Sequence, residues 1–453
     1  MNPGHYISRR GFLKKSTGFA GAAIAFPYIV PSSSLGKAGN AAPSNRITMG
    51  CIGTGNQGIN DLNSFLRDER VQIVAVCDVN RESNGYWDNR VGGREPAKRI
   101  VVEHYGLRAE SGTYRGCTSY EDFRRVIERD DIDVVLVALP DHWHSIVVIE
   151  AAMAGKDIYG EKPLSLTIPE GRAMSDAVKR CGRVFQTGSQ QRSDHNFRRA
   201  CELVRNGRIG KLHTVKCGLP GGTPDISKQG NRTKPKPVPE GFNYDMWLGP
   251  APYAPYCPAR CHVNFRWLLD YSGGQVTDWG GHHPDIAQWG MGTEDTGPVE
   301  IVNAKGVFAK DGFYNTAKEF YFECIYKNGV KLIISNKERG GVTFEGTEGR
   351  IWADRGRHDA QPKSLLESVI GPNEIHLYKS DDHSRNFIDC VISRKETVAP
   401  IETAHRSITI SHLGNIAMRL GRDLKWDPDR EQFVNDEQAE RMMTRSMRSP
   451  WHI

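Results

Sequence analysis

The sequence lacks long apolar runs and has few cysteines for its length. No stretch approaches the 18 apolar residues of a membrane-spanning helix, which excludes a polytopic membrane protein. Ten cysteines in 453 residues are too few for a small scaffold held together by disulfides. With 38% hydrophobic and 25% charged residues, the composition is that of a folded globular protein of two or three domains.

Acidic residues are absent from the first 45 positions, which carry five cations. The other residues hold 55 cations and 54 anions, so nearly all of the formal charge of +6 belongs to this leader. The rest of the chain has no basic surplus that would attract a phosphate backbone, and no nucleic-acid partner is expected.

The leader is typical of an export signal. Arg9 and Arg10 precede a modestly apolar stretch at 18–30, and small residues follow to Ser44. The paired arginines, with Phe and Leu at this spacing, resemble a twin-arginine signal, whose machinery exports folded cargo. We therefore expect a periplasmic or other extracytoplasmic protein that is loaded with its cofactor before export. An uncleaved membrane anchor is the alternative.

The remaining chain predicts an α/β protein. Residues 46–190 alternate strand and helix signals, as in a Rossmann dinucleotide-binding domain. Residues 191–425 contain successive strands without intervening helices, at about 299–307, 319–326, 331–335 and 342–345. This order indicates an α+β substrate and dimerisation domain with a large, mostly antiparallel open sheet. We expect residues 220–239 to form a loop, residues 383–393 and 402–420 to be helical, and residues 426–453 to be a charged tail on the surface.

A glycine motif lies between a strand signal and a helix signal. Residues 53–58 read Gly-Thr-Gly-Asn-Gln-Gly, and Asp78 ends the next strand. In such a motif Gly53 permits the tight turn, Gly55 lets a pyrophosphate approach the backbone, and Gly58 allows close helix–sheet packing. Asn56 and Gln57 belong to the same turn. Asp78 would bond the ribose hydroxyls and favour NAD, although the nearby Arg81 leaves NADP possible.

Two further strand ends carry polar residues. The apolar run at 133–139 leads to Pro140, Asp141 and His144. The strand that begins at 157 leads to Glu161 and Lys162, followed by proline. Because open α/β sheets bind ligands at the carboxyl ends of their strands, we predict that Pro140, His144, Glu161 and Lys162 contact the cofactor.

These motifs resemble the Gfo/Idh/MocA family of oxidoreductases, which includes glucose–fructose oxidoreductase and inositol dehydrogenase. The resemblance rests on residues 53–58, on 140–144, on the Glu-Lys-Pro of 161–163 and on the Gly-Gly-Gln-Val-Thr-Asp-Trp-Gly-Gly-His-His-Pro-Asp of 273–285. It covers residues from about 46 to 420. The sequence departs from the family pattern twice, with Asp141 where Asn is usual and Gln275 in place of a third glycine.

The resemblance implies a catalytic set of Lys162, Asp278 and His282. His282 would be the general acid or base, Asp278 would orient its ring, and Lys162 would donate to the reacting oxygen. Because the histidine is doubled, His283 could take part instead. The resemblance also implies that the sheet of the second domain covers the nicotinamide and often mediates dimerisation, so a homo-oligomer is expected.

Weaker predictions concern the substrate and metals. Gln191 and Arg192 follow a strand end, and Trp267 could stack on a sugar ring, so these residues and His283 are candidate substrate contacts. Cys257, Cys261 and His262 have no second ligand pair at zinc spacing, so we predict no metal site. Whether the two cysteines form a disulfide is left open.

The expected function is hydride transfer between NAD and a sugar, polyol or related carbohydrate. Because free NAD is scarce outside the cytoplasm, the cofactor is expected to be bound tightly and regenerated in place. One alternative uses the same residues, namely a glycoside hydrolase that works by transient oxidation, elimination, hydration and re-reduction. The other alternative is a non-catalytic sensor of NAD or carbohydrate.

Overall fold

The computed structural model describes residues 46–86, 90–108, 112–308 and 312–453. The predicted export signal lies outside these residues. No helix within these ranges is both long and apolar enough to cross a membrane.

The N-terminal domain is built on a six-stranded sheet in which all pairs of neighbouring strands are parallel, in the order β3-β2-β1-β4-β5-β6. This is the Rossmann strand order. The first three strands extend from β1 to one edge of the sheet and the last three extend from β4 to the other edge, and such sheets bind dinucleotides at the boundary between β1 and β4. The strands are β1 (Ile47–Ile52), β2 (Val71–Cys77), β3 (Thr118–Tyr120), β4 (Val134–Val137), β5 (Asp157–Gly160) and β6 (Phe185–Thr187). Every residue of β4 and β5 is buried, because helices cover both faces of the sheet.

Helices alternate with these strands and lie on both faces of the sheet. They are α2 (Asn56–Leu66), α3 (Arg94–Gly106), α4 (Arg124–Ile127), α5 (Asp141–Met153) and α6 (Ile168–Arg180). A later helix, α11 (His383–Ser393), returns to pack on α2. The last residues of the chain also return, since Trp451 makes an edge contact with Trp143 of α5, with ring centroids 4.7 Å apart.

The C-terminal domain contains a nine-stranded sheet in the order β13-β12-β11-β7-β10-β9-β8-β14-β15. Only β7 and β10 pair in parallel, so the sheet is mixed but mostly antiparallel, as predicted. Its strands are β7 (Leu212–Gly218), β8 (Glu300–Phe308), β9 (Ala317–Ile325), β10 (Lys331–Ser335), β11 (Gly341–Gly346), β12 (Arg350–Asp354), β13 (Arg357–Gln361), β14 (Leu424–Asp427) and β15 (Gln432–Phe433). The strands β12 to β15 were not expected from the sequence.

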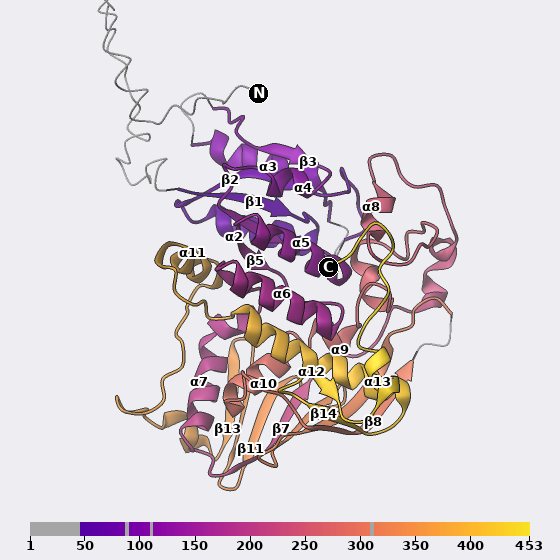
Figure 1. Ribbon diagram of the computed structural model, residues 1–453. Coiled ribbons are helices and arrows are strands. Elements are labelled where there is room, and N and C mark those ends of the chain that lie inside the picture. Colours follow the sequence, from indigo (N-terminus) through magenta and orange to yellow (C-terminus); the bar gives the residue numbers. More distant parts are fainter. Residues whose placement is uncertain (1–45, 87–89, 109–111, 309–311) are drawn as a thin grey trace, which may run out of the picture. The chain divides into compact units, whose positions relative to one another are not determined.

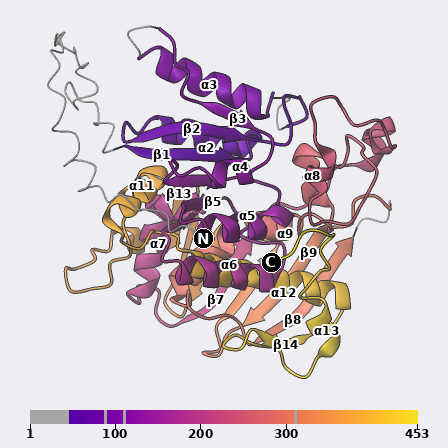
Figure 2. The same ribbon diagram turned by 45° about the horizontal axis from the view of Figure 1, so that its top comes forward.

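Helices cover one face of this large sheet. They are α7 (His195–Arg205), α10 (His283–Met291) and α12 (Ile401–Leu420), and α12 also packs on α6 of the N-terminal domain (Figures 1 and 2). Two of the short helices, α8 (Tyr244–Leu248) and α9 (Gln275–Asp278), lie in the connection between β7 and β8. The predicted loop at 220–239 contains two short 3₁₀ helices. The tail is more than a surface cover, because Phe433, Ala439 of α13 (Glu437–Arg441) and Met443 are buried in the core.

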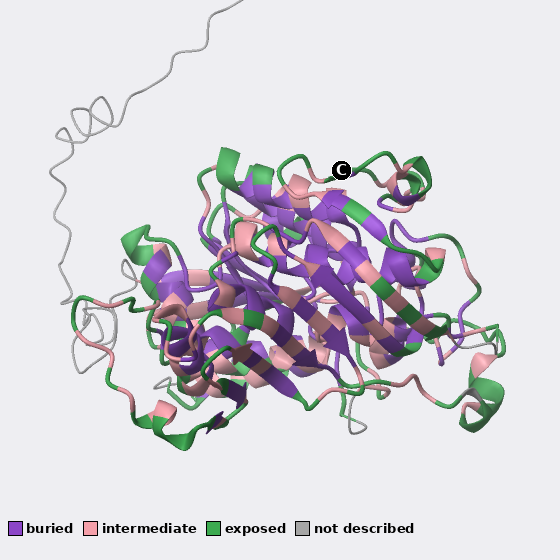
Figure 3. Cartoon of the chain, turned by 90° about the horizontal axis from the view of Figure 1, so that it is seen from below, coloured by how far each residue is buried: buried purple, intermediate pink, exposed green. Residues whose placement is uncertain are grey.

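The other face of the large sheet has no described helix across it (Figure 3). Alternate residues of its strands point outward there and form ion pairs between neighbouring strands. Lys216 bonds Glu345 at 2.8 Å, and Lys331 bonds Glu323 at 2.8 Å. This face is therefore polar, in contrast to the apolar layer that packs under α7, α10 and α12.

Candidate active site

The turn after β1 has a backbone that only glycine fits. Gly53 has a φ of +85°, and a Cβ at this position would lie 2.3 Å from the carbonyl oxygen of Ala138. A Cβ on Gly58 would lie 1.9 Å from the carbonyl oxygen of Gly53. The turn can close against the start of α2 only because both side chains are missing, and it leaves backbone N–H groups at the N-terminus of α2.

Asp78 fastens this turn to the end of β2. One carboxylate oxygen accepts a hydrogen bond from the backbone N–H of Thr54 at 2.8 Å, and the other accepts one from the backbone N–H of Asn80 at 2.8 Å. Burial raises the pKa of Asp78, against these hydrogen bonds. Its carboxylate lines the cavity above the turn, where an adenosine ribose would present its hydroxyls.

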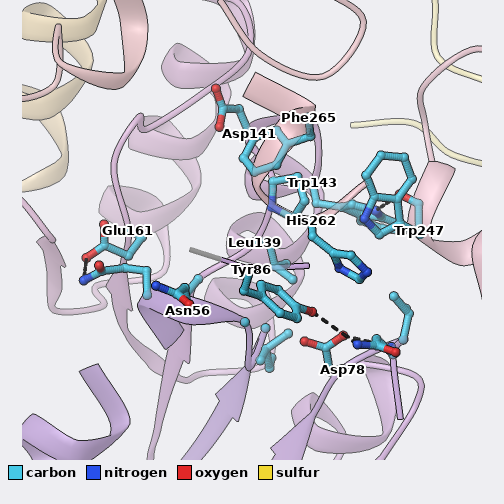
Figure 4. Close-up of a pocket in the computed structure, with 18 of the residues that line it drawn as sticks. Asn56, Asp78, Tyr86, Leu139, Asp141, Trp143, Glu161, Trp247, His262 and Phe265 are labelled. Carbon is cyan, nitrogen blue, oxygen red and sulfur yellow. Dashed lines mark hydrogen bonds between the residues drawn. The ribbon is translucent and has the colours of Figure 1, made fainter. Parts of the chain in front are cut away.

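Most of the predicted cofactor residues line one cavity, which Figure 4 shows in close-up. They are Gly53, Gly55, Asn56, Gln57, Asp78, Pro140, Glu161 and Lys162. Gly58 and His144 are not in the lining. His144 is buried behind it, and its Nδ1 lies 2.7 Å from the carbonyl oxygen of Pro163. It can therefore support the segment that carries Lys162 rather than contact a ligand directly.

An ion pair between the two domains borders the cavity, since Lys162 is in the cavity lining and its partner Asp278 is not. Lys162 Nζ, which follows β5, donates to Asp278 Oδ1 of α9 at 2.9 Å, and both side chains are mostly buried. Arg266 Nε lies 3.4 Å from the same oxygen. Although burial opposes ionisation, Lys162 and Arg266 hold the pKa of Asp278 well below its usual range. Asp278 is therefore a carboxylate throughout the physiological pH range.

His282 lies just beyond this ion pair. Gly281, the residue before it, abuts Lys162, because a Cβ on Gly281 would come 3.1 Å from that of Lys162. The His282 ring is buried, and its Nδ1 has no hydrogen-bond partner among the described residues. Burial, together with the charge of Lys162, lowers the pKa of His282 well below its usual value. The ring is thus a neutral imidazole that can accept a proton, although it is not itself in the cavity lining.

The second histidine of the pair has a different environment. His283 Nδ1 lies 3.0 Å from the carbonyl oxygen of Gly218 at the end of β7, and its ring packs edge-on against Trp279 with centroids 5.2 Å apart. This contact ties α10 to the large sheet. Of the two histidines, His282 is the one beside Lys162 and Asp278.

The other predicted substrate residues have different surroundings from one another. Gln191 is buried outside the cavity lining, and neither of its amide atoms has a hydrogen-bond partner among the described residues. The guanidinium of Arg192 is bound by Asp285 at 2.6 and 2.9 Å and by Glu294 at 2.7 Å, outside the cavity lining. Trp267 is buried in an aromatic cluster. Arg192 and Trp267 are thus explained by packing and pairing within the C-terminal domain.

Sequence reasoning missed an aromatic wall of the cavity. Its members are Tyr86, Trp143, Phe242, Trp247, His262 and Phe265. Tyr86 packs on His262 with ring centroids 4.5 Å apart, and its ring fills the space beside Gly55, where a Cβ would come within 2.7 Å (Figure 4). The density of aromatic residues between 242 and 267 was the only signal in the sequence, and it does not say which of them face a ligand.

Comparisons with known proteins agree with this geometry. Residues 47–189 match the family model described as an oxidoreductase family, NAD-binding Rossmann fold. Residues 201–453 match the model of the C-terminal alpha/beta domain of the same family. The chain belongs to the Gfo/Idh/MocA oxidoreductase family. This family member is therefore an NAD-binding oxidoreductase, and the resemblance inferred from its motifs is confirmed.

Two curated relatives of this Gfo/Idh/MocA protein differ in activity. Myo-inositol 2-dehydrogenase of Thermotoga maritima is 28% identical over 319 residues, which cover 68% of this chain and 75% of that protein. Alpha-N-acetylgalactosaminidase of Shewanella oneidensis is 29% identical over 223 residues, which cover 46% of this chain and 45% of that protein.

Solved structures share the fold. GenD2 from gentamicin A biosynthesis, solved in complex with NAD, has a TM-score of 0.58 at 16% identity and covers 86% of this chain and 98% of its own. The aldose–aldose oxidoreductase of Caulobacter crescentus, solved with glycerol, has a TM-score of 0.56 at 20% identity and covers 84% of this chain and 99% of its own.

Proposed function

We propose that this protein transfers hydride between a tightly held NAD and a carbinol of a sugar, polyol or related carbohydrate, after export from the cytoplasm. The observation that carries the proposal is that Lys162, which lines the cavity of the glycine turn, is paired with Asp278 and has the neutral His282 beside it. Dehydrogenation of an alcohol needs this combination of a base, a cation and a fixed carboxylate. The similarity to a myo-inositol dehydrogenase supports a polyhydroxylated substrate.

In this proposal each residue has a separate task. The glycine turn and Asp78 would hold the dinucleotide, whose nicotinamide would supply a reversible hydride acceptor. The ammonium group of Lys162 donates a hydrogen bond to the substrate oxygen and stabilises its negative charge as the proton leaves. His282 takes that proton. Asp278 keeps Lys162 in place through the 2.9 Å contact and favours the imidazolium that forms.

Tight retention of the cofactor is supported by a segment of the C-terminal domain that crosses the cavity. We name residues 241–266 the strap. One end of the strap pairs with the loop after β2, where Arg81 N donates to Gly241 O at 2.8 Å and Asn243 N donates to Val79 O at 2.9 Å. Its middle is bound to α5, because the indole Nε1 of Trp143 donates to the carbonyl oxygen of Trp247 at 3.1 Å. Because several residues of the strap line the cavity, these contacts would hold them against a bound dinucleotide.

Weakening the strap should therefore accelerate loss of NAD. Asn243 donates from Nδ2 to Glu121 at 2.7 Å and accepts from the N–H of Met246 at the start of α8. Asn243→Ala removes both bonds, and we expect about a tenfold faster dissociation of NAD, since the two bonds together contribute roughly 1–3 kcal/mol. The fraction of NAD that remains bound during dialysis measures this rate.

The matched control for this variant is Asn206→Ala. Asn206 also makes bonds from both ends of its amide, to Glu202 and Ile375, but it is not in the cavity lining. The control should retain NAD like the wild type. If both variants retained as much NAD as the wild type, the strap would not account for the tight binding of NAD.

A second candidate function is NAD-dependent glycoside hydrolysis, in which a hydroxyl is oxidised, the aglycone is eliminated, water adds and the carbonyl is reduced again. The partial match to the galactosaminidase favours it. Release of a chromophore from a chromogenic glycoside, without net formation of NADH, would distinguish it from a dehydrogenase.

Export and assembly complete the proposal. The paired arginines at 9 and 10 support export by the twin-arginine route, and fractionation of cells for the protein tests it. We also propose that the protein assembles into a homo-oligomer through the uncovered face of the large sheet.

The experiment that tests the proposed function has two steps. Mass spectrometry of the purified protein should find co-purified NAD or NADH. The bound cofactor should then change its nicotinamide absorbance when one member of a panel of sugars and polyols is added. A protein that carries no nicotinamide cofactor and binds none would contradict the proposal.

A further inference from the structure

Asp141 is a buried carboxyl group in the cavity lining with no task in the function proposed above. It is the first residue of α5 and follows the carboxyl end of β4. Its side chain is buried, and Oδ2 has no hydrogen-bond partner among the described residues. Figure 4 shows Asp141 and Phe265 among the residues that line the cavity. An unpaired carboxylate oxygen in this position is unfavourable unless it holds a proton or meets a ligand.

Charged groups approach Asp141 from three neighbouring elements. Arg266 comes from the 3₁₀ helix at His262–Trp267, Asp278 from α9 and Lys162 from the end of β5. Both cations already contact Asp278, at 2.9 Å from Lys162 and 3.4 Å from Arg266. The two cations are therefore engaged by Asp278 rather than by Asp141.

Two histidines on α5 complete the surroundings of Asp141. His142 Nε2 lies 3.0 Å from the carbonyl oxygen of Trp247, and His144 Nδ1 lies 2.7 Å from that of Pro163. Burial lowers the pKa of each ring, to about 4 for His142. Neither histidine supplies a positive charge to Asp141 at neutral pH.

Asp141 and Asp278 consequently differ in their protonation. Burial raises the pKa of Asp141 to about 7, whereas the cations keep Asp278 ionised. Two carboxyl groups whose environments separate their pKa values are the usual arrangement for dividing acid and base tasks within one site. An asparagine, which is usual at this position in the family, has no proton to exchange.

We propose that Asp141 is a second acid–base residue of this active site, which exchanges its proton with a substrate oxygen other than the carbinol oxygen served by Lys162 and His282. This inference rests on the proposed function. The simplest step begins after the carbinol has become a carbonyl. His282, after passing the carbinol proton to solvent, takes the proton from the carbon next to the carbonyl, and the bond from the following carbon to its oxygen substituent breaks. The departing oxygen keeps that electron pair and receives the proton of Asp141, which becomes a carboxylate.

The test replaces Asp141 by the isosteric asparagine. In the wild type, the pH profile of kcat/KM for chromophore release from a chromogenic glycoside should show an ionisation near pH 7, with the higher activity on the acid side, where Asp141 is protonated. Asp141→Asn should lower kcat/KM about a hundredfold on that side and remove the ionisation. Bound NAD should stay at the wild-type level. An unchanged profile and rate in Asp141→Asn would overturn the proposal.

A second readout does not depend on activity. Infrared difference spectra of wild type minus Asp141→Asn, with NAD bound, should show the carbonyl band of a carboxylic acid at about pH 6 that is lost by about pH 9. Absence of that band at the lower pH would also overturn the proposal. If the band is present but no sugar or polyol reduces the cofactor, the proposed function fails while the protonated Asp141 stands.

The matched control is Asp381→Asn, which makes the same substitution at an exposed carboxylate outside the cavity lining. Asp381 pairs with Lys379 at 3.3 Å on the surface. This control should keep both the ionisation near pH 7 and the infrared band. Loss of either feature in the control would show that they do not belong to Asp141.

Discussion

Replacement of Lys162 by methionine should slow the reduction of bound NAD by about a thousandfold, within the range for loss of one proton-transfer or charge-stabilising group. The methionine side chain fills a similar space but cannot donate to the substrate oxygen. Arg266 remains beside Asp278, so the carboxylate keeps a cation and the fold should survive. The measurement is the single-turnover change in nicotinamide absorbance after substrate is mixed with the NAD-loaded variant.

The control for this substitution is Lys179→Met, which changes an exposed lysine near the end of α6. Both variants should contain as much NAD as the wild type, and only Lys162→Met should be slow. A Lys162→Met protein that reduces its cofactor at the wild-type rate would remove this residue from the chemistry.

The second large effect is expected at the glycine turn. In Gly58→Ala, the new Cβ would lie 1.9 Å from the carbonyl oxygen of Gly53, so the turn and α2 must move apart. A shift of the backbone that cradles the pyrophosphate should weaken NAD binding by about a hundredfold, since such overpacking costs about 1–3 kcal/mol. Calorimetric titration of the cofactor-free protein with NAD measures the change.

Gly340→Ala is the corresponding control, because no atom would lie within 4 Å of a Cβ at that position. It should bind NAD like the wild type. If Gly58→Ala also bound NAD normally, the dinucleotide would not lie on this turn.

The N-terminal domain could be predicted from the sequence because its signals are local. The central strands β1, β2 and β4 are short, mostly apolar runs, and the glycine turn lies directly between β1 and α2. Strands β12 to β15 were missed for the converse reason. They are short and carry many charged residues, and β14 pairs with β8, which is more than a hundred residues earlier in the chain.

The arrangement of the proposed catalytic residues could be predicted only in part. The motifs pointed to Lys162 and Asp278, and the structure brings these residues to 2.9 Å although 116 residues separate them. What the sequence could not supply was the direction of individual side chains. Arg192 follows a strand end, as a substrate residue would, yet it pairs with Asp285, which lies 93 positions later.

The strap was missed because it has no periodic pattern. Its residues take their positions from contacts with the loop after β2 and with α5, and no local rule in the sequence encodes those contacts. Asp141 was noticed only as a departure from the family pattern. Its distinctive property, a buried oxygen without a partner, depends on the folded surroundings.

The most direct test of the account follows the hydrogen atom itself. The NAD-loaded wild-type protein is mixed with the sugar or polyol that reduces its cofactor, and this compound carries deuterium on its carbinol carbons. The mass of the released cofactor is then measured by mass spectrometry. The account predicts reduced cofactor that has gained one deuterium on its nicotinamide ring, and slower reduction than with the unlabelled compound. Reduced cofactor without deuterium would contradict direct hydride transfer in this cavity.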